Sequence, residues 1–300
     1  MDWMETRQFL SPCFPEVVRT ELEMLLPGEL RELRIRADRP AVFVTATRTA
    51  QIGWAPGQMQ LEALVEALSE HSLYARAEET CQGYITLRGG HRMGLCGRIV
   101  QRGSGHALQD IGSVCIRIAC EWPGAADMLR SRLMLEDRPL SILIIGLPGT
   151  GKTTLLRDLA RQLSSGRKAL QLAVIDERGE LAACLNGVPQ LDVGVSADVL
   201  DGLSKAAAVP WLIRSMSPQV IVTDELSDAD DAACVLDARA CGCAICASVH
   251  GSSLQEVASR PAFAAMMAHR AFDLYAVLSA EGGGQITAMY DRSGSPLELS

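Results

Sequence analysis

Apolar residues in the first third of the chain recur with two different spacings. Some stretches place them every three or four residues, which is typical of a helix with one buried face, and others alternate apolar with polar residues, which is typical of a half-buried strand. The mixture predicts a small α+β domain over residues 1–122, ending at a Trp-Pro-Gly segment. Helices are expected at 15–26, 61–69 and 72–79, and strands at 30–36, 41–45, twice within 83–100, and at 111–119.

From residue 123 onward, short apolar runs rich in Val and Ile alternate with helical patterns, as in a parallel α/β sheet. The expected strands are 141–145, 169–175, 220–223, 243–249, 274–278 and 285–290. The expected helices are 153–163, 211–216, 228–240, 254–259 and 262–272. We expect a loop over 191–204, Pro210 in the first turn of its helix or at a kink, and Ser227 as an N-cap.

The first of these strands runs into a glycine-rich loop and then a helix. The loop fits G-x-x-x-x-G-K-[ST] at every fixed position and comprises Gly146, Leu147, Pro148, Gly149, Thr150, Gly151, Lys152 and Thr153, with Thr154 following. Its glycines let backbone N–H groups surround phosphates, and the helix directs its positive end at them. Lys152 would neutralise the β and γ phosphate oxygens, and the Thr153 hydroxyl would hold Mg²⁺. A glycine turn matching by chance is disfavoured because both a strand and a helix flank it.

Two later strands each end in a pair of acids, Asp176-Glu177 and Asp224-Glu225. The carboxyl ends of parallel strands are where such sheets bind ligands. Asp224 would orient the water shell of Mg²⁺, and Glu225 would polarise an attacking water, with Glu177 as its nearest rival for the base. By spacing alone either pair could be the Walker B element, and strand-end acids are also ordinary turn formers.

A further strand end carries His250, for which structural and catalytic roles are both open. Cys241, Cys243 and Cys246 lie nearby and suggest zinc, but the apolar run around them predicts a buried strand instead. In the first domain, His91 and the arginines at 92, 98 and 117 are either solvated strand residues or contacts to a phosphate bound elsewhere. The residues alone favour solvated strand positions.

The net charge of −8 and a pI near 5.2 argue against a broad basic surface for nucleic acid. The first residues do not have the pattern of a signal peptide, and no stretch approaches the roughly 18 apolar residues of a membrane helix. Ten scattered cysteines suit a reducing compartment. We therefore expect a cytoplasmic protein, unless a partner carries it to a membrane.

Taken together, these motifs resemble the stage III sporulation protein AA family, relatives of the type II and type IV secretion ATPases. The resemblance rests on GLPGTGKTTLLRDLAR, VIDERGE, LIRSMSPQVIVTDEL and ASVHGSSL, and before them on ELRIRADRP, GYITLRGGHRMGLCGR and DIGSVCIRIA. It implies a RecA-like P-loop ATPase domain over 123–300 behind the smaller α+β domain. It also implies ATP and Mg²⁺ as cofactors, and a hexamer that powers a transenvelope complex between mother cell and forespore through membrane-embedded partner subunits.

The resemblance also implies roles for single residues. Glu177 falls in the family's Asp box, Asp224 and Glu225 in Walker B, and His250 in the His box. Arg178 and Arg214 fall inside family motifs without a defined task. Because the family's N-terminal domain can swing over the nucleotide, Arg92, Arg98 and Arg117 become possible contacts. The chain departs from the family at Pro210-Trp211, where an uninterrupted helix is usual, and at Ser227-Asp228, which replaces Gly-Arg.

Two other classes of protein carry the same loop. One is a P-loop kinase or a RecA-type ATPase driven by nucleic acid, which the acidic balance disfavours. The other is a non-enzymatic scaffold in which nucleotide only fixes a ring, and binding without turnover would identify it.

Overall fold

The structure is a computed structural model that describes residues 2–73, 80, 83–102, 105–136 and 138–299. The helix expected over 72–79 falls almost wholly outside these ranges. By internal packing the chain divides into an N-terminal unit, residues 1–120 with 184–190, and a C-terminal unit, residues 121–183 with 191–300. The boundary expected after residue 122, between the α+β domain and the ATPase domain, stays a prediction.

The N-terminal unit is built on a six-stranded antiparallel sheet in the order β3-β2-β1-β6-β5-β4. Its strands are β1 (Leu30–Arg36), β2 (Arg39–Thr45), β3 (Thr49–Gln51), β4 (Tyr84–Thr86), β5 (Arg92–Arg102) and β6 (Gly105–Arg117). Its helices are α1 (Trp3–Leu10), α2 (Glu16–Met24) and α3 (Gln58–Leu68), with short 3₁₀ turns at Ser11–Cys13 and Arg88–Gly90.

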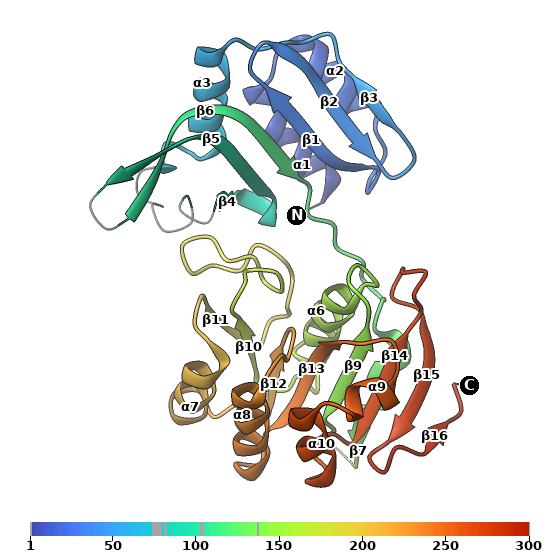
Figure 1. Cartoon of the computed structure of the whole chain (residues 1–300). Helices are drawn as coiled ribbons and strands as arrows, with labels where there is room; N and C mark the ends of the chain where they lie inside the picture. Colours follow the sequence, from blue (N-terminus) through green and yellow to red (C-terminus); the bar gives the residue numbers. More distant parts are fainter. Residues whose placement is uncertain (1, 74–79, 81–82, 103–104, 137, 300) are drawn as a thin grey trace. The chain divides into compact units, whose positions relative to one another are not determined.

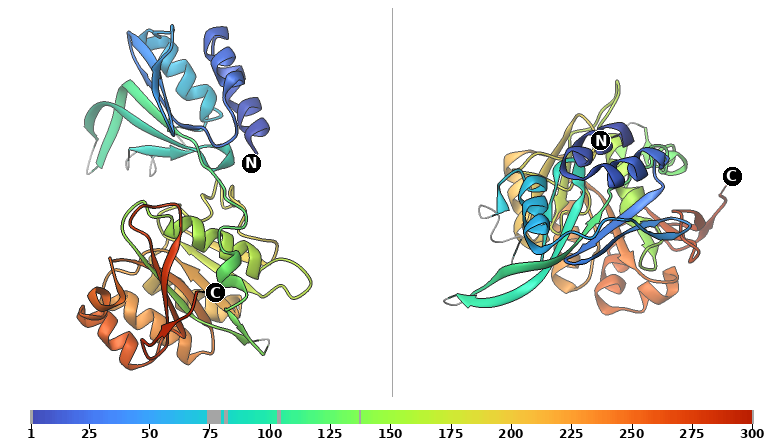
Figure 2. Two further views of the ribbon diagram at one scale, coloured as in Figure 1. Left: turned by 90° about the vertical axis from the view of Figure 1, so that its right-hand side faces the viewer. Right: turned by 90° about the horizontal axis from the view of Figure 1, so that it is seen from above.

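Helices α1, α2 and α3 lie on one face of this sheet (Figures 1 and 2). The alternation that predicted β1 accounts for this, because Leu33 and Ile35 are fully buried beneath the helices while Arg34 and Arg36 keep partial exposure. The first two expected strands, β1 and β2, pair with each other in antiparallel orientation. Alternation along the sequence therefore placed the core face of this sheet correctly.

His91, which follows the Gly-Gly turn, is part of this core rather than a solvated residue. Only 1% of it is exposed, and its Nδ1 accepts a hydrogen bond from the Ala119 N–H at 3.1 Å. Burial lowers the pKa of His91 to about 4, because the charged imidazolium would lose its hydration there. The ring is therefore neutral at physiological pH.

The C-terminal unit is built on an eight-stranded sheet in the order β11-β10-β12-β13-β9-β14-β15-β16. The first six in this order pair in parallel, and β15 and β16 are antiparallel. The strands are β9 (Ile142–Gly146), β10 (Leu172–Asp176), β11 (Ala197–Asp201), β12 (Val220–Thr223), β13 (Ala244–His250), β14 (Leu274–Leu278), β15 (Ile286–Asp291) and β16 (Pro296–Leu297). A two-stranded ribbon, β7 (Met134–Leu135) with β8 (Arg138–Pro139), precedes them.

Helices cover both faces of this sheet, which is why its central strands are apolar throughout. On one face α6 (Lys152–Leu163) packs on β9, β10, β12 and β13. A separate core on the other face joins the sheet to α7 (Lys205–Ser215), α8 (Ala229–Ala240), α9 (Leu254–Ala258) and α10 (Pro261–Ala268). The short α5 (Asp127–Arg130) packs on α6.

Three local predictions in this unit are wrong. The expected loop over 191–204 contains β11, because pairing with β10 makes a strand of a polar segment. Helix α7 begins at Lys205 and not at residue 211, so Pro210 lies inside the helix and only the first-turn alternative is excluded; the preceding alanines favour helix. The N-cap of α8 is Asp228, whose side chain accepts from the N–H groups of Asp230 and Asp231, whereas Ser227 binds the Asp231 carboxylate.

Several short elements were not predicted, namely α1, β3, α5, β7, β8, β16 and the first residues of β6. Most are too short to show a period of their own. Among the described residues, no helix combines the length and the apolar character needed to span a membrane.

The buried His91 predicts acid sensitivity of the fold. His91 binds a proton near pH 6.5 in the unfolded chain and only near pH 4 in the folded chain. The free energy of unfolding is therefore unaffected by this residue well above pH 6.5, and it falls by about 3 kcal/mol as the pH drops toward 4. Urea unfolding of the wild type and of His91→Asn at pH 7.5 and pH 4.5 measures this. The Asn oxygen can still accept from Ala119, so the difference between the two proteins should shrink by about 2–3 kcal/mol at the lower pH. A difference that does not change with pH contradicts the prediction.

Candidate nucleotide site

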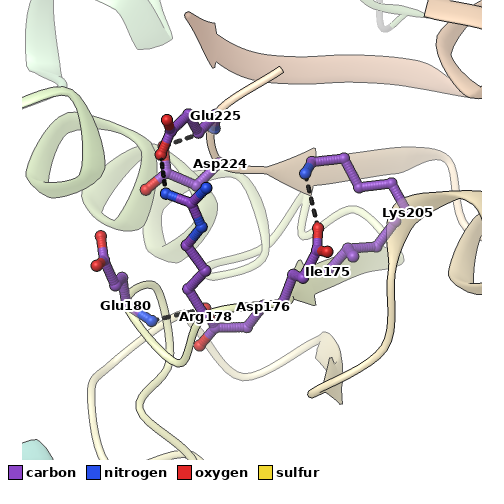
Figure 3. A pocket seen from close by; sticks show the side chains of 8 residues that line it. Ile175, Asp176, Arg178, Glu180, Lys205, Asp224 and Glu225 are labelled. Carbon is purple, nitrogen blue, oxygen red and sulfur yellow. Dashed lines mark hydrogen bonds and ion pairs between the residues drawn. The ribbon is translucent and has the colours of Figure 1, made fainter. Parts of the chain in front are cut away.

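Four parallel strands of the C-terminal unit end at one edge of its sheet and deliver the candidate residues there. Register fixes this convergence, since Gly146 at the end of β9 lies opposite His250 at the end of β13, and β12 and β10 continue the same row. A pocket at this edge is lined by Ile175, Asp176, Glu177, Arg178, Glu180, Lys205, Asp224 and Glu225 (Figure 3). The strand ends thus bring the two acidic pairs and the glycine loop into one region.

The glycine loop connects β9 directly to α6 and needs its glycines for two reasons. Gly149 and Gly151 have φ angles of +77° and +100°, which L side chains rarely adopt. Space is also short, since a Cβ on Gly151 would lie 2.9 Å from the backbone nitrogen of Gly284. Leu147, Pro148 and Gly149 at the apex are exposed, whereas Thr150 is buried. The apex backbone is therefore accessible to a phosphate.

The turn between β14 and β15 contacts this loop. The Gly284 N–H donates to the carbonyl of Thr150 at 2.8 Å. Gly282, Gly283 and Gly284 all have positive φ, so the turn can pass close to Gly151 without side chains.

Lys152 is held by the loop itself. Its Nζ donates to the carbonyls of Gly146 at 2.9 Å and Leu147 at 3.0 Å, and lies 3.1 Å from Nδ1 of His250. Burial lowers the pKa of Lys152, and the nearby carboxylates of Asp224, Glu225 and Glu180 oppose that shift. An ammonium group can only donate, so Nδ1 of His250 must accept; the proton of the neutral ring is then on Nε2.

The hydroxyl of Thr153 donates to Oδ2 of Asp224 at 2.6 Å. The other oxygen of this carboxylate accepts from the Ser248 hydroxyl and from the Glu225 N–H at 2.9 Å. A hydroxyl and a carboxylate oxygen side by side are the hard ligands that Mg²⁺ takes in proteins. Thr153 and Asp224 are therefore suited to a Mg²⁺ ion that also binds phosphate oxygens.

Asp176, the corresponding acid of the other pair, has a different environment. Its carboxylate is 2% exposed and accepts from four consecutive backbone N–H groups, residues 180–183, at 2.7 to 3.1 Å. All of its acceptor capacity is thus used in fixing the loop after β10. Of the two acidic pairs, only Asp224-Glu225 begins with an acid bound to the glycine loop.

The two candidate bases also differ in their partners. Glu225 has φ +40°, an uncommon backbone conformation for a residue with a side chain. Its carboxylate pairs with Arg178 (Figure 3). The same carboxylate lies 3.1 Å from Nε2 of His250. Glu177 instead pairs at 2.8 Å with Lys205, which is 8% exposed and also lies 3.7 Å from Asp231. Glu225 is therefore linked through His250 to Lys152, and Glu177 is bound to α7.

The remaining predicted residues make contacts elsewhere. Arg214 donates to the carbonyl of Pro210 within α7. In the N-terminal unit, Arg92 stacks 4.1 Å over the ring of Tyr84, Arg117 lies 3.4 Å from Glu32, and Arg98 lies 3.9 Å from Asp110. The contact of these three N-terminal arginines with a bound nucleotide stays a prediction. Thr154 follows Thr153 on α6 and is partly exposed.

Three contacts at the site were not predicted from sequence: the bonds of Ser248 to Asp224, of Lys205 to Glu177, and of Gly284 to the glycine loop. Ser248 stands two residues before His250 at a strand end, so alternation along β13 could have indicated it. The other two come from distant segments with no signal in the sequence.

Of the three cysteines before His250, Cys241 is exposed and the other two pack as core residues. Cys243 and Cys246 are buried, and burial raises the pKa of both thiols, to about 12 for Cys246. Within the part of the chain that the structure describes, no three His, Cys, Asp or Glu side chains are grouped so as to hold a metal ion.

Comparisons with known proteins agree with this geometry. The sequence model of the family described as "Sporulation stage III, protein AA" matches residues 5–297. Stage III sporulation protein AA of Bacillus subtilis is 40% identical over 274 residues, covering 90% of this chain and 89% of that protein.

Two solved structures share the fold at low identity. The Yersinia pseudotuberculosis ATPase DotB has TM-score 0.61, 14% identity, and coverage of 93% and 80%. The pilus retraction motor PilT with bound ADP has TM-score 0.55, 15% identity, and coverage of 87% and 76%. The predicted α/β P-loop ATPase fold, with a smaller α+β region before it, is confirmed.

The glycine loop predicts a specific defect in nucleotide binding. Gly151→Ala places a Cβ 2.9 Å from Gly284 at a positive φ, so the loop must shift, and we expect ATP affinity to fall at least about tenfold, or about 1.4 kcal/mol. Gly166→Ala is the matched control, because Gly166 has φ +89° but open space around its Cβ. Titration calorimetry with ATP and Mg²⁺ compares the two. Equal affinities for both variants contradict the assigned loop.

Proposed function

This chain belongs to the family of stage III sporulation protein AA, and we propose that it is a Mg²⁺-dependent ATPase that works as a motor. In this proposal the C-terminal unit binds and hydrolyses ATP, and the energy drives a secretion-like complex during sporulation. Support for a motor comes from the fold shared with a pilus retraction motor.

The observation that carries the proposal is the contact between Thr153 and Asp224 at 2.6 Å. A glycine turn that served only to connect a strand to a helix would not require a carboxylate from another strand at the first turn of that helix. Mg²⁺, when bound here, would neutralise phosphate charge and orient the terminal phosphoryl group. Thr153 and Asp224 would supply its protein-side oxygens, and the loop N–H groups with the start of α6 would bind the phosphates.

Lys152 is the phosphate-binding lysine in this proposal. Its two carbonyl partners, Gly146 and Leu147, are neutral acceptors. Phosphate oxygens carry charge and form charge-assisted hydrogen bonds about twice as strong as neutral ones. Transfer of Nζ from the carbonyls to a phosphate is therefore favourable, and it keeps the ammonium charged against the effect of burial.

Glu225 is our choice for the general base. In the reaction the oxygen of a water molecule bonds to the γ phosphorus, the bond to the β-phosphate oxygen breaks, and the water proton passes to Glu225. Glu225 directly follows the metal-supporting Asp224, and His250 joins it to Lys152. Arg178, which pairs with Glu225, is the proposed group for stabilising the developing negative charge. Glu177 is compensated by the buried Lys205 instead.

We further propose that the active form is a homo-oligomer, a hexamer as the family resemblance implies, whose site is completed by a neighbouring subunit. Arg214, Arg92 and Arg117 are then candidates for contacts made on assembly. Its partners would be membrane-embedded subunits of the stage III sporulation complex, and it would act on the cytoplasmic side of the membrane in the mother cell.

Replacement of the base tests the chemistry. Glu225→Gln keeps the volume of the side chain but cannot take a proton, so we expect ATP binding within about threefold of wild type, about 0.6 kcal/mol, and hydrolysis slowed about 10²–10⁴-fold. Single-turnover hydrolysis with labelled ATP measures both quantities.

Glu177→Gln is the matched variant for this test, because it makes the same change in the rival acid. We expect its hydrolysis to stay within about tenfold of wild type, about 1.4 kcal/mol in the barrier. Normal hydrolysis by Glu225→Gln together with loss in Glu177→Gln would move the base to Glu177. Normal hydrolysis by both would remove either acid from that role.

A further inference from the structure

Ser248 is a polar residue in an otherwise apolar, fully buried stretch of β13. It has no exposed surface, and its neighbours along the strand, Ala247 and Val249, are buried as well. A hydroxyl group in such a place is unfavourable unless it is hydrogen-bonded. The two hydrogen bonds of its hydroxyl go to one segment, the acidic residues Asp224 and Glu225 that follow β12.

Three consecutive residues of that segment are bound to Ser248. Its hydroxyl donates to Oδ1 of Asp224 and accepts from the Glu225 N–H at 3.1 Å. Its carbonyl accepts from the Leu226 N–H at 2.8 Å. One residue of β13 thereby fixes the chain from the metal-supporting acid through the proposed base to the residue beyond it.

The consequence for Asp224 is a fixed carboxylate plane. Thr153 binds one of its oxygens and Ser248 binds the other, so the carboxylate is held between two hydroxyl groups from α6 and β13. Without the Ser248 hydroxyl, only Thr153 and the adjacent Glu225 N–H would remain to orient it. Ligand-orienting groups of this kind commonly affect metal affinity or activity about 10–100-fold.

The consequence for Glu225 concerns its backbone. A residue with a side chain at φ +40° needs its surroundings to hold it in that conformation. The Glu225 N–H has two acceptors, Oδ1 of Asp224 and Oγ of Ser248, and the next N–H binds the Ser248 carbonyl. Loss of the hydroxyl would let this turn relax and move the Glu225 carboxylate.

We propose that Ser248 is a positioning residue that sets both the metal-supporting Asp224 and the base Glu225. It acts through these two acids and does not itself touch the substrate. The inference rests on the proposed function, because it assigns Ser248 a part in Mg²⁺ binding and hydrolysis. A hydroxyl that served only the packing of β13 would affect stability without affecting either.

Mg²⁺ dependence distinguishes the two roles. The test uses full-length Ser248→Ala and Ser248→Cys, which remove the hydroxyl or replace it with a weak donor of similar size, and Ser248→Thr, which restores a hydroxyl. The matched control is Ser141→Ala. Ser141 is equally buried, and its hydroxyl accepts from the Ile245 N–H of the same strand β13, but it lies at the opposite end of the sheet.

Two quantities are measured for each variant, together with its thermal midpoint. Binding of a fluorescent ATP analogue is titrated with Mg²⁺ to give the half-saturating Mg²⁺ concentration, and hydrolysis of MgATP gives kcat. We expect Ser248→Ala and Ser248→Cys to raise that concentration and lower kcat by about tenfold or more. Affinity without Mg²⁺ should change by less than about threefold. Ser248→Thr should recover at least part of both losses, and Ser141→Ala should match the wild type apart from a lower thermal midpoint.

Wild-type Mg²⁺ dependence and kcat in Ser248→Cys would overturn the inference, even if Ser248→Ala fails to fold. Equal changes of the half-saturating Mg²⁺ concentration and of kcat in Ser248→Ala and Ser141→Ala would overturn it as well. If the wild type binds the analogue but releases no phosphate, hydrolysis itself is refuted. The Mg²⁺ titration still decides the role of Ser248 in that case, because it requires binding only.

Discussion

The hydrogen bond between Thr153 and Asp224 is the contact on which the candidate site depends. It joins the first turn of α6 to the residue after β12, although 71 positions separate them in sequence. The two can meet only because β9 and β12 run parallel on either side of β13, so that their carboxyl ends reach the same edge. The glycine loop, the turn at Glu225 and the bonds of Ser248 all lie around this point. The parallel sheet is thus what turns separate motifs into one site.

The two acidic pairs illustrate how similar sequence patterns acquire different roles. Asp176-Glu177 and Asp224-Glu225 each follow an apolar strand, and spacing alone could not separate them. Tertiary contacts do, because Asp176 uses both oxygens to bind four backbone N–H groups while Asp224 binds two hydroxyl groups beside the glycine loop. Which partners surround a carboxylate depends on the chain that folds over it. That information is not present in the local pattern.

Much of the fold could be predicted from the sequence where the signal was local. The bounds expected for β1, β12 and β14 match those of the structure, since each is a run of apolar or alternating residues closed by turn formers. The errors arise where a distant partner decides. β11 is a strand only because β10 pairs with it, and α7 continues through Pro210 because three alanines and the core below it favour helix. The glycine loop was recognised in full, whereas Ser248, Lys205 and Gly284 required the packed structure.

We propose that this chain hydrolyses ATP at a site built on the glycine loop and completed on assembly. The decisive measurement is phosphate release from ATP and Mg²⁺ by the wild type and by Lys152→Ala over a wide range of protein concentrations. We expect turnover per subunit to rise with protein concentration in the wild type and to be absent in the variant. Nucleotide binding without phosphate release at any concentration, or equal release by Lys152→Ala, would contradict it.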